Sequence, residues 1–305
     1  MSKKQSNRQR AADLCHKATD VGHQQCMNWA DQGKVSRRQP VPDAATPNQR
    51  RFEALLAHHL TEPLRDSQLD GAVLGLRGVV PDAVRPTLHL HPVMASWIVA
   101  ELLPCFDVSF GGIRGVPGLR LAHSDGQWML VDVSSTAAVR LKHDDPDWRP
   151  TLRERQRGMT SIWRDAPTRL SRVERQEIAY WESEKVSVAY PKARDLLFSR
   201  VLRRPLLINA AASSHGWANT YNHHTEDIVV EWCCGTPATE IAADLRRSGI
   251  TATAEGVDAR PTYSRDPHPE RIDIGDASLV LRCLNATWCR RGAERIAAAN
   301  RRKYR

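Results

Sequence analysis

The chain has 305 residues, of which 41% are hydrophobic and nine are tryptophan, so it is long enough and apolar enough for one large domain or two ordinary ones. No apolar run approaches the ~20 residues that span a bilayer, and the polar start at residues 1–5 predicts that a secretory signal is absent. Seven scattered cysteines are typical of free thiols in a reducing compartment. We therefore expect a cytoplasmic protein that makes no contact with membranes.

The formal net charge of +9 is concentrated at the two ends of the chain. Residues 1–52 contain ten Lys or Arg against four Asp or Glu, and residues 289–305 contain seven against one, whereas the middle is slightly acidic. Arginine outnumbers lysine by 36 to 8. A GC-rich genome favours arginine over lysine, but this bias does not explain why the net charge lies at the termini. Because guanidinium groups bind phosphate bidentately and stack on bases, the ends predict contact with nucleic acid.

The first 34 residues are predicted to be a basic helical segment. Residues 8–32 have the pattern of one helix or of two helices separated near Gly22, and this spacing is compatible with a helix–turn–helix. Residues 17–29 resemble a short N-terminal stretch of uncharacterised proteins from GC-rich bacteria, and the resemblance implies no activity. Residues 35–48 contain three prolines and are predicted to be a linker.

Residues 49–148 are predicted to form a first unit of mixed sheet and helix. The expected elements in chain order are a helix over 48–60, a strand over 87–90, a helix over 92–104 and strands over 106–113, 119–122 and 127–133. Pro92 is placed to open the second helix and Pro104 to end it. Asp125 and Gly126 favour the positive φ of a tight hairpin turn between the last two strands.

Residues 149–195 are highly charged and are predicted to be a helical connector. Residues 196–305 are predicted to form a second unit, which ends in a basic helix. Its expected elements are strands over 206–210, 227–233, 250–254 and 277–284 and helices over 237–248 and 286–302. Pro237 at the first turn and Gly249 at the stop bound the first of these helices. The predicted fold is α+β, with two mixed sheet–helix units and basic helical segments at both ends.

Three carboxylates in the first unit are candidate site residues. Glu101 is the charged residue in an otherwise apolar helix, Asp107 follows in the next strand, and Asp132 lies in a strand of buried type. Burying a carboxylate is costly unless it is paired or binds a metal ion. The simpler alternative is that Glu101 lies at an exposed helix end and that Asp132 pairs with an arginine.

The segment 101–136 resembles the core of PD-(D/E)xK nucleases, including their RecB-like branch, in which two or three carboxylates hold Mg²⁺. The resemblance implies a metal-dependent nuclease with Glu101, Asp107 and Asp132 as catalytic residues, and with Glu101 and Asp132 as metal ligands. Ser134 stands where the family has its lysine. Mg²⁺ is the expected cofactor if the protein is a nuclease, and the sequence indicates no other cofactor with certainty.

Two further groups of residues have metal-binding chemistry. Residues 223–227 contain two histidines and two acids before a strand, but adjacent histidines in a strand point to opposite faces, so at most one of them lies beside Glu226. The alternatives are a metal or general-base site and a polar loop. The cysteines lack the paired C-x-x-C spacing of structural zinc sites.

The basic residues predicted to contact phosphates lie near both ends of the chain. They are Arg37, Arg38, Arg290, Arg291, Arg295, Arg301, Arg302 and Lys303. Our leading hypothesis is a nucleic-acid-binding protein that contacts the backbone of DNA, in the service of a plasmid, phage or other mobile element. The alternatives are the metal-dependent nuclease and a structural or assembly protein whose basic arms bind an acidic partner.

Overall fold

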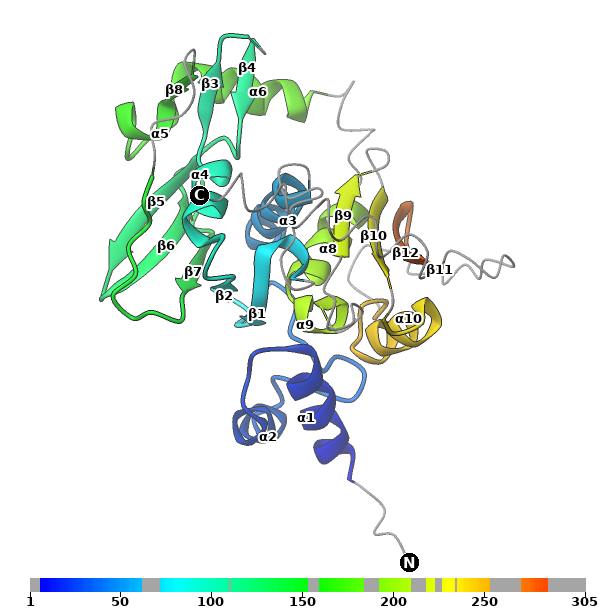
Figure 1. The fold of residues 1–305 in the computed structure, drawn as a ribbon. Helices are drawn as coiled ribbons and strands as arrows, with labels where there is room; N and C mark the ends of the chain where they lie inside the picture. The colour runs from blue at the N-terminus through cyan, green and yellow to red at the C-terminus, as the bar shows by residue number, and fades with distance from the viewer. Residues whose placement is uncertain are drawn as a thin grey trace, which may run out of the picture.

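The computed structural model describes residues 6–61, 72–109, 111–152, 159–183, 192–209, 218–222, 227–233, 235–252 and 270–284. These residues form helices and three sheets, which confirms the predicted α+β class (Figure 1). One continuous cluster of buried apolar side chains includes Leu88 and Leu130 of the five-stranded sheet and Leu279 of the four-stranded sheet. The domain boundaries expected from the sequence stay a prediction.

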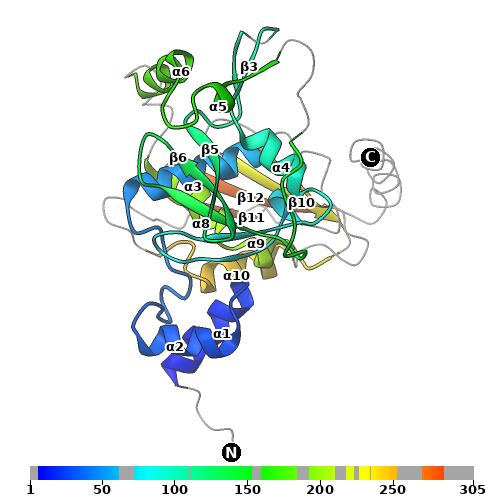
Figure 2. The same ribbon diagram turned by 90° about the vertical axis from the view of Figure 1, so that its left-hand side faces the viewer.

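Two short helices at the N-terminal end, α1 (Asn7–Ala18) and α2 (His23–Asp31), pack against each other, as one of the two interpretations of residues 8–32 predicted. Their interface is a small cluster of buried side chains separate from the main core. Both ribbon views place the pair at one end of the molecule (Figures 1 and 2). The pair is attached to β1 by a hydrogen bond of 2.9 Å from the Asp20 amide to the Val79 carbonyl.

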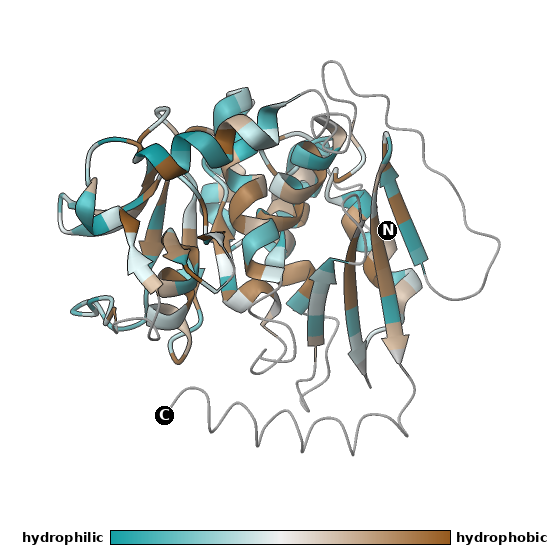
Figure 3. Cartoon of the chain, turned by 90° about the horizontal axis from the view of Figure 1, so that it is seen from above, coloured by the Kyte–Doolittle hydropathy of each residue, from teal (hydrophilic) through white to brown (hydrophobic). Residues whose placement is uncertain are grey.

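Two helices in the middle of the molecule, α3 (Pro47–Thr61) and α8 (Lys192–Leu202), pack against each other and lie between the sheets (Figure 2). The first confirms the helix predicted over 48–60. Gln49 attaches α3 to the five-stranded sheet because its amide donates to the Ala138 carbonyl at 3.1 Å and accepts from the Ala138 amide at 3.0 Å. Figure 3 shows apolar stretches on these helices and on the long strands beside them, where the core forms.

The five-stranded sheet consists, in spatial order, of β1 (Leu76–Val80), β2 (Thr87–Leu90), β7 (Ala138–Lys142), β6 (Gln127–Asp132) and β5 (Leu119–Ser124). Strands β2 and β7 are parallel and the other neighbours are antiparallel. The predicted tight turn joins β5 to β6, with φ of 51° at Asp125 and 73° at Gly126. A 3-10 turn, η1 (Val73–Gly75), precedes β1, and α4 (Ala95–Leu102) occupies the helix predicted over 92–104.

The other two sheets lie on different sides of the central helices. The three-stranded sheet has the order β4 (Gly112–Arg114), β3 (Cys105–Asp107), β8 (Met159–Ser161), and the four-stranded sheet has the order β11 (Glu270–Ile274), β12 (Ala277–Leu284), β10 (Asp227–Cys233), β9 (Ala218–Asn222). The single strand predicted over 106–113 is therefore a hairpin of β3 and β4. Helices α5 (Ile162–Asp165) and α6 (Arg172–Glu182) lie near the three-stranded sheet, and α10 (Ala238–Arg247) confirms the helix predicted over 237–248 (Figure 1).

Two of the strands predicted in the second unit are not strands in the residues that the structure describes. The segment predicted as a strand over 206–210 is the short helix α9 (Pro205–Asn209). A run of three apolar residues fits a strand and a helix equally well, and a proline at the start favours the first turn of a helix. Residues 250–252, the described part of the strand predicted over 250–254, form a turn after α10. The helix predicted over 286–302 lies outside the described residues.

Candidate nucleic-acid interface

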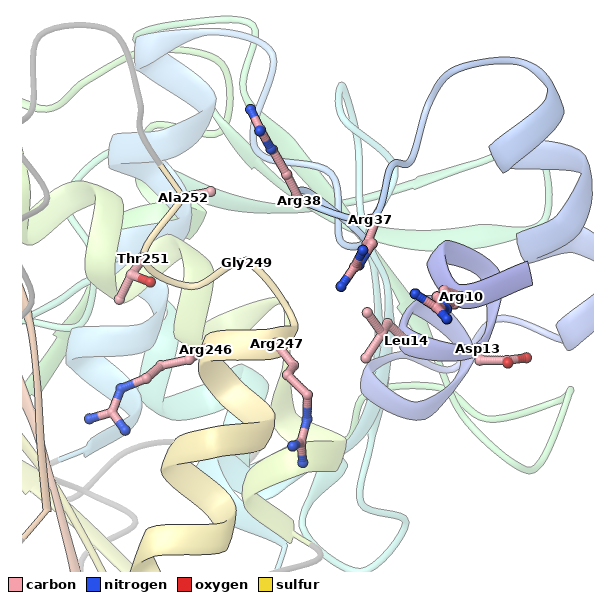
Figure 4. Close-up of a pocket in the computed structure, with 10 residues that line it drawn as sticks. All are labelled: Arg10, Asp13, Leu14, Arg37, Arg38, Arg246, Arg247, Gly249, Thr251 and Ala252. Carbon is pink, nitrogen blue, oxygen red and sulfur yellow. The ribbon is translucent and has the colours of Figure 1, made fainter. Parts of the chain in front are cut away.

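A cavity of about 660 Å³ lies between α1, the segment that precedes α3 and the C-terminal end of α10 (Figure 4). Arginine side chains from all three places line it, together with one acidic side chain. The charged lining residues are Arg10, Asp13, Arg37, Arg38, Arg246 and Arg247. We call this site the arginine cavity.

The end of α10 supplies two of the arginines because the opposite face of the helix is buried. The stripe that ends at Leu245 packs into the core, which leaves Arg246 and Arg247 in the last turn at the cavity. The helix stops at Gly249, whose φ is +80°. A Cβ on this glycine would lie 2.8 Å from the Arg38 carbonyl oxygen, so glycine is required for the two walls of the cavity to approach each other.

Buried arginines at the end of α8 hold these walls in place. Arg200 donates to the Asp43 carboxylate at 2.6 Å and to the Ile250 carbonyl at 2.7 Å. Burial alone would raise the pKa of Asp43, but the hydrogen bond and charge of Arg200 lower it below its usual value. Arg204 donates to the hydroxyl of Ser248 at 2.9 Å. The segment before α3 and the segment after α10 are thus attached to the same helix end.

Arg203 fixes the rest of the segment before α3. It is fully buried and donates to both carboxylate oxygens of Glu53 on α3, at 2.6 and 2.7 Å. It also donates to the Pro42 carbonyl at 2.8 Å, beside the buried Val41. The segment expected to be a linker over 35–48 has no helix or strand before α3, but buried contacts hold it against the core.

Three of the cavity arginines are available to an external anion. Arg10, Arg37 and Arg38 form no side-chain hydrogen bond or ion pair with another residue that the structure describes. Asp13, the acidic side chain of the lining, accepts from His23 at 2.8 Å. A guanidinium group presents five donors in a fork that matches phosphate, so these side chains have unused capacity for anions.

The charges of the other two cavity arginines are partly neutralised by nearby acidic side chains. Arg246 lies 3.6 Å from Glu270, and Arg247 pairs with Asp244. Asp244 also accepts from Lys17 of α1 at 2.6 Å, which joins α1 to α10. Burial opposes the ionisation of Asp244, but the hydrogen bonds from Lys17 and Arg247 keep its pKa below the usual value.

The sequence identified only part of this site. Arg37 and Arg38 were predicted to contact phosphates and lie in the cavity, whereas the predicted residues from 290 to 303 lie outside the described part of the chain. Sequence reasoning missed Arg10, Arg246 and Arg247. The last two directly precede the predicted helix stop, which is a local signal that they are exposed, but only the fold places them opposite Arg37 and Arg38.

The three carboxylates predicted as nuclease residues are described, and the structure does not bring them together as a metal site. Glu101 is half-buried in α4, whereas Asp107 ends β3 in the three-stranded sheet and Asp132 ends β6 in the five-stranded sheet. Asp107 accepts from the Arg114 guanidinium at 2.7 Å. Its charge is therefore compensated by protein.

Asp132 stabilises the turn that follows β6. Its carboxylate accepts from the hydroxyl of Ser134 at 2.7 Å and from that of Ser135 at 2.6 Å, and not from the arginine that the simpler alternative expected. Among the residues that the structure describes, no group of three or more His, Cys, Asp or Glu side chains could hold a metal ion. The residues present do not fit an Mg²⁺ site at Glu101 and Asp132.

The remaining sequence features add no second site. Residues 223–226, with both adjacent histidines, lie outside the described residues, and among the described cysteines those at 15 and 26 are free thiols. Within the described ranges, no helix has the length and apolar character needed to cross a bilayer. In comparisons with known proteins, no family model matches the chain, and no curated protein or solved structure matches it.

Proposed function

We propose that the protein binds nucleic acid, with DNA as its partner, through the phosphate backbone at the arginine cavity. The observation that carries the proposal is that five arginines from three separate segments line one cavity. A concave surface on which positive charge predominates concentrates the field and attracts a polyanion. Arginine is also the side chain best suited to bidentate contact with phosphate.

The composition of the cavity favours contacts to phosphates over contacts to bases. The lining residues that the structure describes include no aromatic side chain on which a base would stack. Phosphate contacts position a protein on nucleic acid but do not read its sequence. We therefore expect binding that tolerates different sequences and weakens steeply with salt.

The buried arginines of α8 also support this function. They fix the segment before α3 and the turn after α10 independently of any ligand. Binding to a site whose walls are already ordered costs less conformational entropy than binding to free arms. The cavity is thus prepared for a phosphate backbone before the DNA arrives.

Fluorescence anisotropy with a short labelled DNA duplex at several salt concentrations tests the proposal. For the wild type, the logarithm of affinity should fall linearly with the logarithm of salt concentration. The double variant Arg37→Gln/Arg38→Gln should bind more weakly. Its slope should be smaller by about 0.9 for each phosphate that the protein no longer neutralises, so by about 1.8 for the two arginines.

The matched control is Arg149→Gln/Arg172→Gln, which removes the same charge from two exposed arginines outside the cavity. The control should keep the affinity and slope of the wild type. Absence of binding at low salt would refute the proposed function. Equal reductions in affinity in the two double variants would show that net charge, and not the cavity, attracts the DNA.

A further inference from the structure

A second cavity, of about 430 Å³, is lined by side chains of α3, α6 and α8 and by Ile113 of β4. Among the described residues, it shares no lining side chain with the arginine cavity. Its ionisable lining residues are Arg51, His58, His59, Glu177, Glu182 and Asp195. This site therefore contains different chemistry on a different set of helices.

A neighbouring cavity of about 380 Å³ continues the second one along α3 and α6. The residues common to both are Arg51, Leu55, Pro117, Trp181 and Glu182. The continuation adds the carboxylate of Asp132 beside Ser134 and Ser135. We call the two cavities together the α3–α6 cleft. Its two lobes have Asp195 at one side and Asp132 at the other.

His58 is a neutral imidazole with a fixed tautomer. Its Nδ1 lies 2.9 Å from an amino group of the Arg194 guanidinium and 2.9 Å from the Asn222 amide nitrogen. Since the guanidinium can only donate, Nδ1 accepts and the ring proton is on Nε2. Burial first, and then the electrostatic interactions with His59 and Arg194, lower the pKa of His58 well below its usual value.

His59 and Asp195 have unused hydrogen-bonding capacity in the cleft. Neither side chain forms a hydrogen bond or an ion pair with another described residue. Burial, and secondarily the charge of Arg194, lowers the pKa of His59 to about 4, so its ring is neutral. Burial raises the pKa of Asp195 even though arginines lie nearby. A cation placed beside Asp195 would add to the partial stabilisation that these arginines give.

The charges of the cleft favour a cationic ligand. Among the described lining residues of the first lobe, the three acids Glu177, Glu182 and Asp195 outnumber the arginine Arg51, which lies 3.3 Å from Glu182. Glu177 accepts from the indole nitrogen of Trp181 at 2.8 Å, which orients the ring. Carboxylates in a partly desolvated cavity attract a cation and repel an anion.

From this geometry we propose that the α3–α6 cleft binds a linear aliphatic amine with two or more cationic nitrogens, that is, a diamine or polyamine. Asp195 and Asp132 would each take one nitrogen, because they lie in different lobes of the cleft. The methylene stem would lie on the apolar side chains of Leu55 and Pro117. The face of Trp181 would add a cation–π contact.

Isothermal titration calorimetry of the full chain, freed of nucleic acid at high salt, tests the proposal with spermidine as the probe. Spermidine should bind the wild type saturably with one site. Butylamine, which has one cationic nitrogen, should bind more weakly, and glutarate, which is anionic, should not bind. The variant Asp195→Asn should bind spermidine about tenfold more weakly, the reduction expected from one charge-assisted contact.

The matched control is Asp125→Asn, which removes the same charge from the exposed β5–β6 turn, where asparagine tolerates the φ of 51°. This variant should bind spermidine like the wild type. Absence of saturable binding, or equal weakening by both substitutions, would overturn the proposal. Arg37→Gln/Arg38→Gln should leave spermidine binding unchanged, so a failure of the DNA proposal and a failure of this one give different results.

Discussion

The buried pair of Arg203 and Glu53 predicts that Glu53→Gln destabilises the wild type but stabilises a protein that already carries Arg203→Met. Both side chains are fully buried, and two hydrogen bonds of 2.6 and 2.7 Å join them. Gln49 and Ser199 donate to the same carboxylate, at 2.9 and 2.6 Å. Replacing Arg203 by methionine would leave this carboxylate buried without its counter-charge.

The structure sets the expected magnitudes. Arg203→Met removes both bonds to Glu53 and the bonds to the carbonyls of Pro42 and Pro81. Breaking one side of a buried pair costs about 3–5 kcal/mol, out of a total stability of about 5–15 kcal/mol. Glu53→Gln should cost a similar amount in the wild type. In the Arg203→Met background the same change removes an unpaired charge and should restore about 1–3 kcal/mol.

Urea unfolding of the wild type, the two single variants and the double variant, followed by circular dichroism, completes a double-mutant cycle. The expected result is that the double variant is more stable than Arg203→Met alone. If Glu53→Gln destabilises both backgrounds by the same amount, the two side chains are not coupled, and the assignment of the buried pair is refuted.

Three further predictions concern single residues. Asp20 raises the pKa of His89 through a hydrogen bond, so protonated His89 stabilises the fold below about pH 6.5. This contribution to stability is lost as the pH rises through the folded-state pKa of His89. In thermal melts at successive pH values, the variant His89→Gln should lack this pH dependence. Because burial raises the pKa of Asp195, Asp195→Asn should raise the Tm at neutral pH, and this increase should disappear below about pH 4. Gly249→Ala should cost more than ~1 kcal/mol in urea unfolding and weaken DNA binding, because its Cβ would meet a carbonyl oxygen at 2.8 Å. Gly33→Ala is the control, since its φ is +70° but nothing lies within 4 Å, and a destabilisation as large as that at Gly249 would contradict the close approach.

Local signals in the sequence predicted the turn and the helix whose formation depends on residues close together in the chain. Asp125 and Gly126 adopt the positive φ that a two-residue hairpin turn needs, and no distant residue is required for this. The helix over 237–248 was bounded by Pro237 and Gly249, and α10 begins and ends within one residue of these limits. The strand predicted over 206–210 failed because a short apolar run has no periodicity that separates strand from helix.

The arginine cavity depends on contacts that no local pattern contains. Arg200, Arg203 and Arg204 are fully buried, although arginine is ordinarily a surface residue. The acidic partners of Arg200 and Arg203, at positions 43 and 53, are about 150 residues away, and the intervening sequence does not indicate the pairing. The residues that line the cavity are likewise far apart in the sequence. The charge distribution therefore predicted basic ends, but it could not predict that α1, the segment before α3 and α10 lie together.

The pairing of α3 with α8 also determines when the native contacts of α3 can form during translation. Glu53 and Arg203 are separated by 150 residues, and ribosomes add about 5–20 residues per second. Glu53 is therefore synthesised about 8–30 s before its counter-charge. Until α8 and the turn after α10 have emerged, the early part of the nascent chain has no native partner for its buried acid. The arginine cavity, which we propose as the DNA-binding surface, is consequently complete only late in synthesis.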